Sequence, residues 1–104
     1  MAEVKRIIED QQLERAAETL RVVSHPARLR IIEVLEEGEL SVTQIQDILG
    51  ITQSQTSQHL NNMRVRGVLK SRKNGNMVYY SIANDDVVKV IHCIRNDRTN
   101  NRAN

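Results

Sequence analysis

The side chains from Gln53 to Met63 have the clearest chemistry in this sequence, because most of them end in an amide or a hydroxyl group. Amides of Gln and Asn can pair bidentately with adenine, and hydroxyls can contact several bases. At helical spacing only Thr56, Leu60 and Met63 form an inward stripe, which leaves the polar side chains outside. We interpret the segment as a helix that reads base edges in DNA. The alternative is an ordinary polar surface helix.

The charges support the first interpretation by their distribution. Residues 48–84 contain five basic residues and no acid, whereas residues 1–47 contain six basic and ten acidic residues. An acid-free block indicates a surface that faces a polyanion, although a solvated basic face would look the same. Side chains that could contact the DNA backbone are Thr52, Arg64, Arg66, Arg72, Lys73, Asn74 and Asn76.

Helices at residues 5–23, 26–37, 42–49, 53–66 and 85–95 are expected to position these side chains. Ser41 with Gln44, and Thr52 with Gln55, have the spacing of capping boxes that begin two helices. The three residues from Gly50 to Thr52 between those helices are typical of a helix-turn-helix. Residues 39–40, before the third of these helices, predict a very short strand.

A hairpin follows the helix-turn-helix, with strands at residues 68–73 and 77–82. Asn74-Gly75 between them predicts a type I′ turn. A hairpin in this place is a wing. The fold class is therefore mainly α with a small β-hairpin wing (α+β), a winged helix-turn-helix of order α-α-(β)-α-α-β-β-α.

Composition limits the remaining choices. The chain of 104 residues has the size of one domain, which we place at residues 1–96, with a polar, disordered tail at residues 97–104. No apolar run is long enough to span a membrane. Cys93 is the lone cysteine, which fits a cytoplasmic protein. The sequence contains no nucleophile–base pair, phosphate loop or paired carboxylates, so we expect no catalytic residues, no cofactor and no enzyme activity.

Four segments together resemble the arsenic-repressor (ArsR/SmtB) family of bacterial winged-helix regulators. They are residues 24–32, 39–42, 53–60 and 78–82, and the resemblance extends over residues 20–94. It implies a homodimer that binds an imperfect palindrome in a promoter, usually as a repressor. The family's base-contacting positions correspond to Gln53, Ser54, Ser57, Gln58 and His59, and Gln55 adds a contact of its own. Pairing through the first and last helices implies an interface of Leu13, Ala16, Ala17, Leu20, Val87, Val90, Ile91 and Ile94.

The sequence departs from the family at its metal sites. Ser41 and Thr43 stand where many members have cysteines, and hydroxyls cannot replace thiolates for soft metals. We therefore predict no metal site and leave the effector unassigned. Two alternatives stay open: a winged-helix interaction module without DNA binding, and a regulator that senses metal or redox state through His92 and Cys93. A single small buried thiol at the dimer contact is the simpler interpretation of Cys93.

Overall fold

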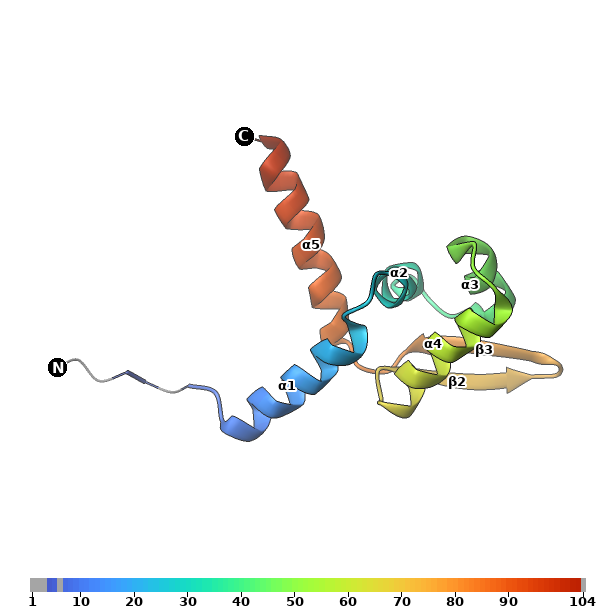
Figure 1. Cartoon of the computed structure of the whole chain (residues 1–104), viewed down its shortest axis with the longest axis horizontal. Helices are drawn as coiled ribbons and strands as arrows, with labels where there is room; N and C mark the ends of the chain where they lie inside the picture. The colour runs from blue at the N-terminus through green and yellow to red at the C-terminus, as the bar shows by residue number, and fades with distance from the viewer. Residues whose placement is uncertain (1–3, 6, 104) are drawn as a thin grey trace.

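The computed structural model describes residues 4, 5 and 7–103, and only the backbone from residue 97 onward. Within that range the order of elements predicted from the sequence is confirmed (Figure 1). The elements are α1 (Asp10–Val23), α2 (Pro26–Leu35), β1 (Leu40–Ser41), α3 (Val42–Leu49), α4 (Gln53–Val65), β2 (Leu69–Asn74), β3 (Met77–Ile82) and α5 (Asp86–Ala103).

The three strands form one antiparallel sheet with the order β1-β3-β2. Leu40 of β1 pairs with Tyr80, so the short strand before α3 attaches the helix-turn-helix to the wing. The hairpin points away from the central region where α1 ends and α5 begins (Figure 1). This arrangement places α4 and the wing on the same side of the fold.

The hairpin turn differs from the prediction. Asn74 pairs with Met77, so the two central residues are Gly75 and Asn76 rather than Asn74 and Gly75. Gly75 has a φ of 62°, and none of the described non-glycine residues has a positive φ. A positive φ at the first central position alone belongs to a type II′ turn, so the predicted type I′ turn is wrong. Glycine at that position leaves Asn74 free to extend β2.

The core is aliphatic, as the scarcity of aromatic residues requires. Ile31 and Ile32 of α2, Ile45 of α3 and Leu60 of α4 have no exposed surface. Each helix of the helix-turn-helix therefore contributes to one shared cluster, which fixes their mutual arrangement. The other members of this cluster are Val22, Val23, Leu35, Met63, Val68, Leu69, Tyr80, Val87 and Ile91.

Several boundaries lie away from the predicted positions. The first helix begins at Asp10 rather than at residue 5, and α2 ends at Leu35 rather than at residue 37. The last helix continues to Ala103, through residues that the sequence assigned to a disordered tail. The division at residue 96 stays a prediction. No helix within the described ranges has the length and apolar character needed to cross a bilayer.

Candidate nucleic-acid interface

Both helices of the helix-turn-helix begin with the predicted capping boxes. The Ser41 hydroxyl accepts from the Gln44 amide at 3.1 Å, and the Gln44 side chain accepts from the Ser41 amide at 2.9 Å. Thr52 and Gln55 make the same reciprocal pair, with both bonds at 3.1 Å. Each box satisfies two backbone donors that helix geometry leaves free. Gly50 ends α3 in the left-handed conformation, which lets the chain turn sharply into α4.

One side of α4 is buried and the other is polar and exposed. Thr56, Leu60 and Met63 have no exposed surface, which confirms the predicted inward stripe. The exposed side chains of Gln53, Ser54, Ser57 and Gln58 take part in none of the side-chain hydrogen bonds among the described residues. Their donors and acceptors are therefore available to an external ligand.

The two other residues predicted to contact bases are engaged within the chain. Gln55 belongs to the capping box at the start of α4. His59 is half-buried, and its Nδ1 accepts a hydrogen bond from Arg28 Nε at 3.1 Å. Burial, and then the neighbouring His25 and Arg28, lower the pKa of His59. Sequence patterns did not single out Arg28, because its partners lie on a distant part of the chain.

Residues from α4 and from the wing line a shared hollow. Its volume is about 330 Å³. Gln53 and Ser57 contribute from α4, while Asn76 and Met77 contribute from the tip of the hairpin. The structure thus brings predicted base-contacting residues next to one predicted backbone-contacting residue. The hollow is also lined by Val42, Thr43, Val78 and Tyr80.

The predicted phosphate-contacting cations differ in their surroundings. Lys73 is exposed and makes no ion pair with any described residue, whereas Arg72 is paired with Glu39 and Arg66 with Glu18. Arg64 donates to Asn61 Oδ1 at 2.7 Å and, like Lys73, makes no ion pair within the described part of the chain. Residues 48–84 contain no acid, but the fold brings Glu18 and Glu39 from the earlier part of the chain into contact with two of their arginines. Thr52, Asn74 and Asn76 are exposed.

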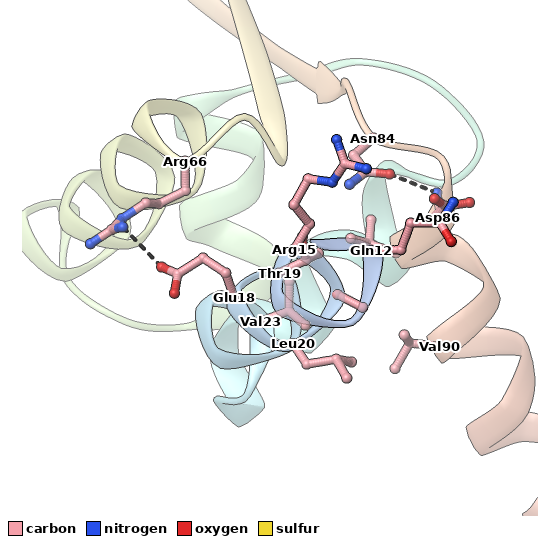
Figure 2. Close-up of a pocket in the computed structure, with 12 residues that line it drawn as sticks. Gln12, Arg15, Glu18, Thr19, Leu20, Val23, Arg66, Asn84, Asp86 and Val90 are labelled. Atoms are coloured by element: carbon pink, nitrogen blue, oxygen red, sulfur yellow. Dashed lines mark hydrogen bonds and ion pairs between the residues drawn. The ribbon is translucent and has the colours of Figure 1, made fainter. Parts of the chain in front are cut away.

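The α1 and α5 helices border an open groove with a volume of about 740 Å³. Figure 2 shows Leu20 of α1 and Val90 of α5 at this groove, and the ion pair of Glu18 with Arg66 on another side of it. Leu13, Leu20 and Ile94 are each about half exposed, at 50%, 51% and 50%. These three residues, with the exposed Ala16 and Ala17, are the predicted interface residues that a partner can reach.

Three of the predicted interface residues lie deeper. Val87 and Ile91 are buried in the core of the single chain, and Val90 is half-buried. Val87 and Ile91 therefore support the α5 surface from behind instead of forming it. The difference arises because the α5 face that contains them packs against α2.

His92 and Cys93 do not form a joint site. His92 Nε2 contacts Glu36 of α2, and Arg95 donates to the same carboxylate at 2.9 Å. These two hydrogen bonds, led by that of His92, lower the pKa of Glu36. Cys93 is exposed in the single chain. The described residues contain no group of three or more metal-ligating side chains.

Comparisons with known proteins agree on one kind of relative. The profile described as "Bacterial regulatory protein, arsR family" matches residues 25–71. Transcriptional repressor PagR of Bacillus anthracis is 46% identical over 85 residues, which cover 81% of this chain and 85% of PagR. The PagR crystal structure superimposes with a TM-score of 0.73 and covers 83% of this chain and 99% of that chain.

Two further structures have the same fold. HlyU from Vibrio cholerae has a TM-score of 0.78 at 28% identity and covers 85% of this chain and 96% of its own. A homodimeric winged helix-turn-helix DNA-binding domain from Mycobacterium bovis has a TM-score of 0.72 at 22% identity, covering 94% of this chain and 91% of that domain. The latter shows likeness of fold alone.

Proposed function

Because this chain belongs to the arsR family of bacterial regulatory proteins, we propose that it is a transcriptional repressor that binds a promoter site in double-stranded DNA. The family assignment confirms the resemblance indicated by the sequence motifs. The repressor role follows the name of PagR. One observation carries the proposal: the exposed row of unpartnered amides and hydroxyls on α4, beside the wing.

The proposed mechanism places α4 in the major groove. Gln53 and Gln58 pair with base edges there, and Ser54 and Ser57 add single hydrogen bonds. Gln55 and His59 belong to the predicted set too, but each already has a partner within the chain. We therefore assign base reading to the first four residues.

The backbone of the DNA is held by cations and short polar side chains around this helix. Lys73 and Arg64 make electrostatic contacts to phosphates, since neither has an acidic partner among the described residues. Such contacts position the protein without reading sequence. Arg66 and Arg72 can contact phosphate only if their ion pairs with Glu18 and Glu39 break and the phosphate takes the place of the carboxylate. Thr52, Asn74 and Asn76 complete the proposed set.

The proposed active form is a homodimer paired through α1 and α5. Leu13, Leu20 and Ile94 expose about half of their surface, and they lie on the two helices that border the open groove. Burial of these residues by a second copy removes apolar surface from water, and two α4 helices related by a twofold axis match a palindromic site. The proposal includes no metal, no cofactor and no catalytic step, assigns no effector, and places the protein in the cytoplasm.

Selection of duplexes from a random-sequence library tests this function. We expect the purified chain to enrich an imperfect palindrome and to bind it at least about a thousand times more tightly than a scrambled duplex. A protein that enriches no sequence in dilute salt is not a sequence-specific regulator. That result would favour the alternative of an interaction module without DNA binding.

A further inference from the structure

One arginine side chain joins three helices near α4. Arg28 of α2 donates from Nε to His59 Nδ1 at 3.1 Å and from Nη1 to Asn62 Oδ1 at 3.0 Å. The same Nη1 donates to the backbone carbonyl of Val22, in the last turn of α1, at 2.9 Å. All three bonds are part-buried, so water competes for them less than at the open surface. The guanidinium thus fixes the middle of α4 to the junction between α1 and α2.

These hydrogen bonds determine the protonation state of the His59 ring. A guanidinium is a donor only, so His59 Nδ1 must present a lone pair and the proton of the neutral ring lies on Nε2. Among the described residues, the charged or titratable neighbours of the ring are Arg28 of α2 and His25 of the α1–α2 turn, whose ring centre is 4.7 Å away. Neither is an acid. A protonated His59 would therefore lose the bond to Arg28 and gain no compensating anion.

The bonds also lie on a defined flank of α4. His59 and Asn62, three residues apart, face Arg28, while Gln53 and Ser57 line the hollow beside the wing. The apolar stripe of α4 holds the helix by contacts without strong direction. Hydrogen bonds to a planar guanidinium have a fixed geometry and can set the rotation of the helix about its axis.

We propose that Arg28 is a positioning residue for DNA recognition: through His59 Nδ1 and Asn62 Oδ1 it sets the rotation at which α4 presents Gln53, Ser54, Ser57 and Gln58 to the bases. In this arrangement His59 is an acceptor for Arg28 and makes no base contact. The inference rests on the proposed DNA binding and adds a residue outside the recognition helix. It also makes recognition sensitive to acid, because protonation of His59 removes the acceptor.

Two pairs of variants test the role of Arg28. Arg28→Met keeps much of the side-chain length but has no hydrogen-bond donor. Arg28→Lys keeps the positive charge but lacks the several N–H donors that the guanidinium holds in one plane. His59→Asn places an amide oxygen near the position of Nδ1 and does not titrate, whereas His59→Leu has no acceptor. Each is compared with the wild type on a duplex selected by the wild type and on its scrambled version, with urea midpoints measured in parallel.

The expected result is a loss of discrimination without a general loss of binding. Arg28→Met and His59→Leu should lower the ratio of selected to scrambled affinity by about tenfold or more. Arg28→Lys should lower it as well, and affinity for scrambled DNA should stay within about twofold, because phosphate contacts are untouched. His59→Asn should discriminate like the wild type at pH 7.5. It should also keep that discrimination in acid, at pH values well below the ordinary histidine pKa of 6.5, where His59 of the wild type becomes protonated and discrimination is lost.

A DNA-free measurement separates this inference from the proposed function. Nitrogen-15 NMR of the full chain should show His59 protonated at Nε2 in the wild type and a mixture of tautomers in Arg28→Met. A wild type that selects a palindrome while Arg28→Met discriminates equally well overturns the role of Arg28. His59→Asn behaving as badly as His59→Leu at pH 7.5 would instead make His59 a base contact. A wild type that selects no sequence overturns the proposed function itself, whatever the NMR shows.

Discussion

Arg72 of β2 and Glu39, the residue before β1, form a two-pronged ion pair across the sheet. Arg72 Nε donates to the two carboxylate oxygens of Glu39 at 3.0 and 2.9 Å, and Nη2 contacts the same group. The guanidinium also lies 4.7 Å from the ring centre of Tyr79. Hydrogen bonding from Arg72 lowers the pKa of Glu39, so its carboxylate stays charged to a lower pH than that of an ordinary glutamate. A cation predicted to contact phosphate is therefore held by a carboxylate.

Removal of that carboxylate charge should strengthen DNA binding. In Glu39→Gln the charge of Arg72 becomes available to phosphate, so affinity should rise for selected and scrambled duplexes alike. The slope of log affinity against log salt should steepen by up to about 0.9, the value for one added phosphate contact. Fluorescence anisotropy across a salt series measures both quantities. Glu37→Gln changes the net charge equally and should have little effect on the slope; equal slopes for the two variants would contradict the prediction.

Truncation of Gln53 should relax base preference. Gln53→Ala loses an amide that we assign to a base edge, and each good bidentate contact is worth about 1–3 kcal/mol of discrimination. Affinity for the selected duplex should fall by that amount, with scrambled DNA unaffected. Competition binding with single-base variants of the selected site locates the base. Gln11→Ala, an exposed amide on α1, is the control. Unchanged discrimination in Gln53→Ala would remove this residue from the reading face.

A polar group at Leu20 should weaken the dimer. Its side chain is 51% exposed in the single chain, so about half of a leucine remains for a partner to cover. Burial of that half contributes about 1 kcal/mol to the free energy of association, and each of the two subunits contributes one such leucine. Leu20→Gln should therefore raise the dissociation constant of the dimer about thirtyfold. Sedimentation velocity across a concentration series measures this change. Ile48→Gln on α3 alters a side chain of similar exposure, 53%, and should leave association unchanged.

Acid should destabilise the contact between α2 and α5. The pKa of Glu36 lies below its ordinary value of 4.5, chiefly because His92 and then Arg95 hydrogen-bond to it. The unfolded chain therefore binds the proton more readily, so the stabilisation is complete above pH 4.5 and is lost as the pH falls through the folded pKa. Urea midpoints from about pH 7 to pH 3 should show a shallower acid fall in Glu36→Gln. Glu14→Gln on exposed α1 is the control, and a curve parallel to the wild type in Glu36→Gln would refute the contribution.

The sequence predicted the parts of this fold that depend on near neighbours. Capping boxes at Ser41 and Thr52 act over three residues, so their spacing was enough to locate the starts of α3 and α4. The hairpin turn was placed one residue early, because Asn-Gly fits two alternative registers and strand pairing chose between them. The side-chain partners of Arg28 and Arg72 lie more than thirty residues away in the chain, and no local pattern could have identified them.

The ion pair between Glu18 and Arg66 has a consequence for the architecture of the operator. It joins α1, the proposed pairing helix, to the residue that ends α4, with Arg66 Nη1 2.9 Å from Glu18 Oε1. Val22 and Val23 share the core cluster with Leu60 and Met63, so α1 also packs against α4 through the core. In a twofold pair joined through α1, these contacts help to set the distance between the two recognition helices. The number of base pairs between the two half-sites of the DNA site is then fixed. One inserted base pair at the centre rotates the second half-site by about 35° about the DNA axis, away from its recognition helix.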